Sequence, residues 1–374
     1  MRVALLPVFP QEHWTSIGVY TRRLTQGLRA LGVELVEVHP QAWEWPASSW
    51  RILGRQFSLR TLGIYLSRWL KYPLLLRNLE ADVFHILDNS YGHLAFFLDP
   101  RRTVVTSHGG TPLSWRKWSR EGPAIWQFDW AFKGMLRAAR ILCVSEYAKR
   151  ELLAEAPGYP PHRVLVVYHG IEPIFQPLPQ EERAQWRKHL LSSGGSWLLL
   201  HVGHNAARKN VEVLYRVVAL LRAKGVAVHL LRVGGLPTPE MESLIKELGI
   251  GKWVTHVGHV ENTELPAYYS AADVFLFPSL YEGFGIPLIE AMACGAPVVC
   301  SDMPLFHEVC GEAALFADPL SPEAIAEAVR GVLEKAALRE ALRRRGLERA
   351  KLFNWQETAR QTLAVYRQVS QENA

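Results

Sequence analysis

Residues 274–297 read VFLFPSLYEGFGIPLIEAMACGAP, and this stretch decides the fold that we predict. Its apolar start is typical of a buried parallel strand, and the residues after that strand predict a helix that begins near Pro287, a residue suited to the first helical position. Gly283 and Gly285 allow a ligand to approach the backbone between strand and helix. Because backbone amides at a helix start carry positive partial charge, the stretch predicts a site for an anion or for a developing oxyanion.

Two glutamates border this predicted site. Glu282 lies in the loop and Glu290 in the first helical turn, eight residues later. A carboxylate accepts hydrogen bonds from paired sugar hydroxyls, which requires acceptor geometry more than a shifted pKa. Taken one at a time, Glu290 could merely complement the helix dipole, and Glu282 could be a solvated loop charge. Because both occur in one string, we expect both to border one ligand and to meet different parts of it.

The wider chain predicts two doubly wound α/β domains. Residues 2–38 and 197–233 both read as strand, loop, amphipathic helix, glycine stop and second strand, about 195 residues apart. In the second copy the helix is expected from about Val211 to Ala223, with Gly225 after it. Further apolar runs fit buried parallel strands at 82–87, 103–107, 141–145, 164–168, 253–258, 274–279 and 298–302. Ligands of such sheets lie beyond the carboxyl ends of the strands.

Proline density marks the predicted domain boundary. Residues 171–179 contain Pro173, Pro177 and Pro179, and we take them as the linker. The sequence thus predicts a first domain over 1–175, a second over 176–354, and a final helix over 355–370 that joins the first domain. The final helix is expected because Asn354 and Glu357 resemble a capping box.

Composition favours a soluble, cytoplasmic two-domain protein. The 374 residues are 49% hydrophobic and 21% charged. The start, MRVALLPVFP, does not resemble a signal peptide, and no run approaches the roughly 18 apolar residues of a spanning helix. The four cysteines show no C-x-x-C pairing and the histidines no H-E-x-x-H spacing, so we expect reduced core thiols and no metal centre.

Positive charge gathers in the first half. Residues 1–180 hold 21 Lys and Arg against 14 Asp and Glu, a balance of +7, whereas the remainder holds 21 against 22, a balance of −1. This implies an anionic partner for the first half. The segment from Trp43 to Arg77 mixes tryptophans and cations, and suits either an anionic membrane face or two surface helices whose tryptophans pack on the sheet. A second patch, which could form an acceptor platform, comprises Trp115, Arg116, Lys117, Trp118 and Arg120.

Four strings together resemble glycosyltransferase family 4, the retaining enzymes of the GT-B fold. They are SIGVYTRRLTQGL (16–28), VGHNAARKN (202–210), the E-x7-E block at 282–290, and EVCGEAALFADP (308–319). The resemblance implies two Rossmann-like domains. It also implies that Glu290 holds the ribose hydroxyls of a nucleotide sugar and that Glu282 lies at the sugar.

The basic pair Arg208 and Lys209 follows a predicted strand at its carboxyl end. Two adjacent cations opposite a helix start can neutralise a diphosphate leaving group, although a basic pair is usually only a solvated helix start. The family motif favours diphosphate contacts, together with the backbone of Gly203. His204 departs from that motif, since many relatives have Arg or Thr there. The cationic contact is then missing, shared with Arg208, or supplied by an imidazolium.

Two first-half residues complete the expected site. Gly18 is expected in the loop after the first strand, where the family's glycine loop approaches the phosphates; relatives often have two adjacent glycines there, and a simple turn is the alternative. His108 follows the strand at 103–107. Taken by itself, it would more often be a buried hydrogen-bonded histidine, but the resemblance favours a catalytic contact with a sugar hydroxyl or the leaving group.

We therefore expect a retaining, metal-independent transferase that moves a hexosyl group, mannosyl favoured, from a GDP- or UDP-sugar to a glycan or glycolipid hydroxyl. No D-x-D, G-x-G-x-x-G, P-loop or nucleic-acid motif occurs in the sequence, and Arg208 and Lys209 with helix amides can replace a metal. Donor contacts are further expected at Gly258, Val260, Gly283, Phe284 and Gly285, with Glu282 catalytic. A sugar phosphorylase or epimerase, or a non-catalytic carbohydrate- or lipid-surface-binding protein, remain alternatives.

Overall fold

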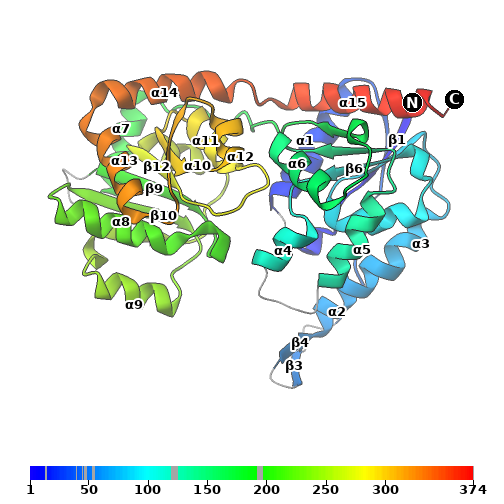
Figure 1. Ribbon diagram of the computed structural model, residues 1–374, viewed down its shortest axis with the longest axis horizontal. Coiled ribbons are helices and arrows are strands. Elements are labelled where there is room, and N and C mark those ends of the chain that lie inside the picture. The colour runs from blue at the N-terminus through cyan, green and yellow to red at the C-terminus, as the bar shows by residue number, and fades with distance from the viewer. Residues whose placement is uncertain are drawn as a thin grey trace. The chain divides into compact units, whose positions relative to one another are not determined.

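The computed structural model describes residues 1–374 except 13–14, 39, 44, 46–48, 53–54, 119–124, 192–196 and 374. It divides into two compact units, drawn in Figure 1: unit 1 is 1–169 with 355–374, and unit 2 is 170–354. Residues 170–175, assigned above to the first domain, belong to unit 2. A reason is visible in the backbone, where the Ile171 N–H donates to the Phe353 carbonyl at 3.0 Å. The proline-rich segment at 171–179 is therefore part of unit 2.

Unit 1 contains a six-stranded sheet in the order β2-β1-β5-β6-β7-β8, and every pairing is parallel. The strands are β1 (Arg2–Leu6), β2 (Glu34–Glu37), β5 (Val83–Ile86), β6 (Thr103–Ser107), β7 (Arg140–Cys143) and β8 (Val164–Val166). All of β5 and β6 is buried, as expected for parallel strands covered on both faces. The strand order reverses between β1 and β5, so their carboxyl ends mark the switch point of this sheet.

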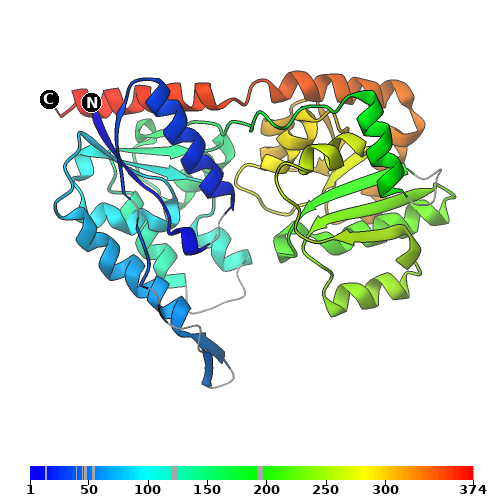
Figure 2. The same ribbon diagram turned by 180° about the vertical axis from the view of Figure 1, so that it is seen from behind.

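One face of this sheet is covered by α1 (Thr15–Ala30) and α15 (Trp355–Gln371), which pack against each other (Figure 2). Their contact is close, because a Cβ added to Gly27 would lie 2.6 Å from the Cβ of Ala359. Beneath them, His85 Nδ1 bonds the Tyr366 hydroxyl at 2.5 Å and Nε2 bonds Thr106 Oγ1 at 2.7 Å. The final helix thus completes both the apolar layer and a buried polar network of unit 1.

The other face carries shorter helical segments. They are α2 (Leu59–Leu66), the π-helical turn η2 (Ser67–Lys71), α3 (Tyr72–Leu76), η3 (Asn89–Phe97), α4 (Pro112–Trp118), α5 (Ile125–Met135) and α6 (Glu146–Glu155). The 3₁₀ turns η1 (Pro10–Glu12), η4 (Pro100–Arg102) and η6 (Pro161–Arg163) connect strands and helices. An antiparallel hairpin, β3 (Ser49–Ile52) with β4 (Arg55–Ser58), was not expected from the sequence.

The tryptophan-rich segment contains both buried and exposed side chains, and its contact with a membrane stays a prediction. Trp69 packs its ring on His93 at 4.1 Å, and Arg68 is buried with its guanidinium 3.5 Å from Glu12, so Arg68 is not a surface cation. In contrast, Leu70 and Leu74 are each 53% exposed. Glu44 and Arg120 lie outside the described residues, as do the side chains of Trp50, Arg51, Arg55, Trp115 and Trp118.

Unit 2 has the same architecture, with a parallel sheet in the order β11-β10-β9-β12-β13-β14. Its strands are β9 (Trp197–Gly203), β10 (Val228–Gly234), β11 (Val254–Val257), β12 (Val274–Phe277), β13 (Val298–Ser301) and β14 (Ala314–Ala317). β14 was not predicted. The order reverses between β9 and β12, which places a switch point at their carboxyl ends.

Helices cover both faces of this sheet (Figure 1). α8 (Val211–Ala223), with the predicted bounds, packs with α13 (Pro322–Glu334) over β9, β10 and β12, while α11 (Ile286–Ala293) packs with α14 (Ala336–Ala350). The other helical segments are α7 (Gln180–Leu190), η7 (Ala207–Lys209), α9 (Pro239–Glu247), η8 (Gly251–Trp253), α10 (Leu265–Ala271) and α12 (Pro304–Cys310). Among the described residues, no helix is both long and apolar enough to cross a bilayer.

Candidate functional site

The loops after β9 and β12 meet at the switch point of unit 2. The Leu280 N–H donates to the Arg208 carbonyl at 2.7 Å, which joins the two loops directly. Asn210 adopts a left-handed conformation, φ 52°, that few other residues tolerate. From there its Nδ2 donates to the carbonyls of Pro278 at 3.3 Å and Pro319 at 2.7 Å. The sequence therefore builds a fixed platform from segments about 70 residues apart.

A buried carboxylate and two cations lie on this platform. Glu282 Oε2 is 3.0 Å from Arg208 Nη1, and Glu282 Oε1 is 2.5 Å from Lys209 Nζ. Burial alone would raise the pKa of Glu282, but Lys209 and Arg208 together hold it below its usual value. Glu282 is thus ionised at neutral pH. We call these three residues the Arg-Lys-Glu cluster, and its net charge is +1.

Lys209 is the most enclosed cation of the cluster. Its ammonium lies 4.9 Å from the centre of the Phe277 ring, and only 7% of its side chain is exposed. Burial lowers the pKa of Lys209, and the charge of Glu282 opposes that effect. A buried ammonium keeps its charge only with such partners. The two cations of the cluster are therefore already protonated and can stabilise added negative charge without first taking up a proton.

The start of α11 requires glycine. Gly285 has φ 90°, and a Cβ there would lie 3.1 Å from Leu288 Cδ1 and 3.3 Å from Phe306 Cε1. Pro287 stands in the first turn, as predicted. The Phe284 ring is buried and packs edge-on to Phe353 at 5.7 Å, so Phe284 can meet a donor only through its backbone.

Glu290 is the second carboxylate of the E-x7-E block, and its position is fixed by Tyr269. The Tyr269 hydroxyl donates to Glu290 Oε2 at 2.7 Å. Burial raises the pKa of Glu290 to about 7, despite that hydrogen bond. The structure thus separates the two glutamates electrostatically: Glu282 is held ionised by cations, whereas Glu290 exchanges its proton near neutrality.

We expect three residues to contact the donor through their backbone, namely Gly203, Gly258 and Val260. They lie at or just after the carboxyl ends of β9 and β11. The Gly234 N–H donates to the Gly258 carbonyl at 3.1 Å, and the Gly235 N–H donates to the Gly203 carbonyl at 3.2 Å. Val260 is half-buried in the loop that follows β11. His204 Nδ1 accepts from the Ala206 N–H at 3.2 Å and is therefore unprotonated, which argues against an imidazolium there. Partial burial, with Lys209 and Arg208, lowers the pKa of His204.

Arg232 belongs to the same edge and was missed from the sequence. It is fully buried in β10, between the registered neighbours His201 and His256. Its guanidinium bonds the Gly203 carbonyl at 3.2 Å and also contacts the Gly235 carbonyl and Asn205 Oδ1. An arginine within the aliphatic run VAVHLLRVG was the available signal, because buried arginines need an unusual reason.

In unit 1, His108 is held by the protein at both ring nitrogens. Its Nε2–H donates to the Leu87 carbonyl at 2.8 Å, so its Nδ1 must accept from His169 Nε2 at 3.2 Å. The two rings stack at 5.0 Å, and Tyr20 meets His108 edge-on at 4.7 Å. Burial lowers the pKa of His108, although the charge of Asp88 opposes it. A sugar hydroxyl could therefore hydrogen-bond to a ring nitrogen of His108 only by replacing its hydrogen bond to Leu87 or to His169.

Gly18 does not lie in a loop, contrary to our expectation. It lies in the first turn of α1, is exposed, and has open space where a Cβ would be. Its φ is not positive, so the backbone there does not require glycine. The helix begins at Thr15, because one exposed glycine costs a helix only about 1 kcal/mol. Gly18 can still contact a ligand through its backbone at the start of α1.

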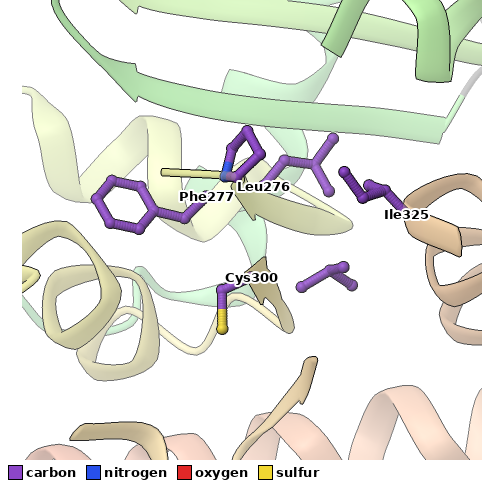
Figure 3. Close-up of a pocket in the computed structure, with 6 residues that line it drawn as sticks. Leu276, Phe277, Cys300 and Ile325 are labelled. Carbon is purple, nitrogen blue, oxygen red and sulfur yellow. The ribbon is translucent and has the colours of Figure 1, made fainter. Parts of the chain in front are cut away.

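Figure 3 shows a small pocket lined by residues of β12, β13 and α13 and by Pro278. Its lining is apolar: Leu276, Phe277, Pro278, Val299, Cys300 and Ile325. Such a lining offers no hydrogen bonds to a sugar or phosphate, so we assign the pocket to core packing. All four cysteines are free, as expected, and they are fully buried, whereas the sequence suggested half-buried core thiols.

Comparison with known proteins agrees with this geometry. Residues 17–174 match the model of Glycosyltransferase Family 4, and residues 182–349 match that of Glycosyl transferases group 1. The sucrose-phosphate synthase from Thermosynechococcus elongatus superposes with a TM-score of 0.77 at 22% identity, covering 99% of each chain. The chain has the GT-B fold, and its two domains match models of these two glycosyltransferase families.

Relatives of this chain differ in their named activities. The O-antigen chain mannosyltransferase B of Escherichia coli is 34% identical over 62% of this chain and 61% of that protein. The alpha-maltose-1-phosphate synthase of Mycolicibacterium smegmatis is 28% identical over 99% of this chain and 100% of that protein. The chain matches only about three fifths of several curated relatives. The transferase class is thus shared, whereas donor and acceptor are not.

Proposed function

We propose that this glycosyltransferase moves a hexosyl group, mannosyl favoured, from a nucleoside diphosphate sugar to a glycan or glycolipid hydroxyl, with retention and without a metal. The observation that carries the proposal is the Arg-Lys-Glu cluster at the switch point of unit 2, where ligands of doubly wound sheets bind. Its surplus positive charge suits a diphosphate. The lean towards mannosyl rests on the mannosyltransferase relative.

In the proposed mechanism the acceptor oxygen approaches the anomeric carbon of the sugar on the same face from which the diphosphate departs. The bond from the anomeric carbon to the diphosphate oxygen breaks, the new C–O bond forms on the same face, and the acceptor proton passes to the leaving phosphate. Arg208 and Lys209 stabilise the charge that develops on that phosphate. Glu282 positions the sugar and stabilises its oxocarbenium-like centre without a lasting covalent bond. Glu290 accepts hydrogen bonds from the ribose hydroxyls.

Contact with an anionic membrane surface is the partner that we propose for unit 1. Leu70 and Leu74 are exposed one helical turn apart, and Arg77 is exposed close beyond them. Apolar side chains beside cations suit a headgroup interface. On this basis we place the enzyme in the cytoplasm, at the inner membrane face. Replacing Leu70 and Leu74 by aspartate should abolish co-sedimentation with vesicles containing phosphatidylglycerol. Equal binding of the variant would contradict this.

The donor is tested first by thermal shift with UDP, GDP and ADP and their glucose or mannose conjugates, because a ligand at 100 times its Kd stabilises the fold by about 2.7 kcal/mol. The best donor is then incubated with a lipid-linked acceptor, and NMR reads the anomeric configuration of the product. We expect an α-linked product from an α-linked donor, equal rates with and without EDTA, and no requirement for inorganic phosphate. An inverted product, or a loss with EDTA that manganese restores, would refute the respective part.

The role of the cluster is tested with Glu282→Gln, and exposed Glu242→Gln in α9 is its matched control. The first variant should lower kcat by at least about a hundredfold, which is typical for lost transition-state electrostatics. The control should not change it. A stable sugar adduct on Glu282 in the wild-type enzyme would overturn the mechanism, and wild-type kcat in Glu282→Gln would overturn the assignment.

A further inference from the structure

Arg232 in β10 ties together the backbone at the carboxyl edge of the unit 2 sheet. Its Nη2 donates to the Gly203 carbonyl at 3.2 Å, and it also contacts Asn205 Oδ1 and the Gly235 carbonyl. Asn205 in turn donates from Nδ2 to the Leu236 carbonyl at 2.5 Å. One guanidinium thus joins the loop after β9 to the loop after β10.

These two loops pack closely around the guanidinium of Arg232. A Cβ on Gly234 would lie 2.4 Å from the Gly203 carbonyl oxygen, and a Cβ on Gly235 would lie 2.6 Å from the side-chain oxygen Oδ1 of Asn205. The fixed fork of donors on arginine can reach acceptors on both loops at once, whereas a lysine ammonium is a point donor. The chemistry therefore selects arginine at this position.

The charge of Arg232 is not compensated locally. No Asp or Glu in the described part of the chain forms an ion pair with it, and its Nε has no hydrogen-bond partner among those residues. The groups that face it are the Tyr215 hydroxyl and neutral histidines at 201, 204 and 256. A buried charge without a counter-ion is costly, and an anionic ligand nearby would lower that cost.

The charges at the carboxyl ends of these strands leave a positive surplus. Arg208, Lys209 and Arg232 are cations, Glu282 is ionised, and Glu290 has a pKa of about 7, so the surplus lies between one and two at neutral pH. A nucleoside diphosphate carries about one more negative charge than the corresponding monophosphate. A positive surplus therefore favours the diphosphate.

We propose that Arg232 is a positioning residue of the donor site that fixes the loops after β9 and β10 and makes the site prefer a diphosphate over a monophosphate. It acts through the loop backbone and through its field, without touching the substrate. The inference rests on the proposed function, since it assumes that a nucleoside diphosphate binds at this edge. It adds a third cation to the two in the basic pair.

The test compares Arg232→Met with a matched control, Arg222→Met. Arg222 also donates to a backbone carbonyl, that of Val228 at 2.9 Å, and lies over the Trp253 ring at 4.4 Å, but it belongs to the end of α8. Calorimetry measures the Kd of UDP and UMP, and of GDP and GMP, for each protein. We expect Arg232→Met to reduce the preference for diphosphate over monophosphate by about fivefold or more. The control should keep the wild-type preference.

Asn205→Asp with Asn205→Ala tests the charge without removing Arg232. The aspartate gives the guanidinium a counter-ion at the place of its present amide partner, and both variants lose the bond to the Leu236 carbonyl. We expect the diphosphate preference to fall further in Asn205→Asp than in Asn205→Ala. Arg232→Lys should keep the preference but bind every nucleotide more weakly, because one ammonium cannot join both loops.

The outcomes separate the role of Arg232 from the proposed function. If the wild-type protein binds no nucleoside diphosphate, the proposed function itself fails. If the wild type prefers diphosphates and Arg232→Met keeps that preference, or if Asn205→Asp equals Asn205→Ala, the role of Arg232 is refuted. Should Arg232→Met fail to fold, the two Asn205 variants and Arg232→Lys decide the question.

Discussion

Replacing Lys209 by methionine isolates the most enclosed charge of the candidate site. Methionine keeps most of the apolar stem, so the change chiefly removes the ammonium that lies 2.5 Å from Glu282 Oε1. Breaking a buried ion pair costs about 3–5 kcal/mol when the remaining charge has no other partner. Here Arg208 still lies 3.0 Å from Glu282 Oε2, so we expect a smaller loss than this range, about 2–3 kcal/mol. Both paired side chains are less than a tenth exposed, so solvent screening removes little of it.

The assay is a double-mutant cycle on the free energy of unfolding in urea. Lys209→Met and Glu282→Met should each destabilise unit 2, whereas the double variant should be more stable than the sum of the two losses predicts by about 2 kcal/mol. Exposed Lys246→Met in α9 is the control, with an expected change within about 0.5 kcal/mol. A Lys209→Met protein as stable as the control, or additive losses in the double variant, would refute a buried ion pair at this site.

Three further changes test other parts of the structure. Burial raises the pKa of Glu290 from 4.5 to about 7, so its contribution to stability is full below pH 4.5 and is lost as the pH rises through 7. This loss amounts to about 3 kcal/mol. Glu290→Gln should abolish the loss, which urea titrations across that pH range would measure. Gly285→Ala should cost about 2 kcal/mol by denaturation, since its φ is 90°, while Gly331→Ala in α13, with open space at its Cβ, should be neutral or stabilising. Gly27→Ala should cost about 1–3 kcal/mol through the clash with Ala359, and adding Ala359→Gly should recover part of the loss; unchanged melting of the single variant would contradict that packing.

Regular elements of the fold were predictable because their patterns are local. α8 has the expected bounds from Val211 to Ala223, since its apolar spacing, the turn before it and Gly225 after it lie within one short stretch. β14 was missed because its four residues, Ala314–Ala317, are too few to show a pattern. The hairpin of β3 and β4 was missed because each of its strands has only four residues, which are too few to show a pattern.

The site was predictable in its residues and less so in their contacts. The sequence indicated that Arg208, Lys209 and Glu282 serve one ligand, but it could not show that they bond one another, because 73 positions separate Lys209 from Glu282. His108 was expected to face a ligand, yet its ring nitrogens bond Leu87 and His169, partners that only the folded sheet brings close. Local patterns identify candidates, whereas contacts between distant segments require the tertiary structure.

The return of α15 to unit 1 has a consequence for biosynthesis. Unit 2 is one uninterrupted stretch, whereas unit 1 receives its last helix only after residues 170–354 have been translated. Until then the apolar face of α1, with Leu24 and Leu28, and the His85 ring have no covering helix in the nascent chain. The sequence of unit 2 is therefore complete before that of unit 1. A released chain that ends at residue 354 should contain a protease-resistant unit 2 beside a unit 1 that chaperones still recognise.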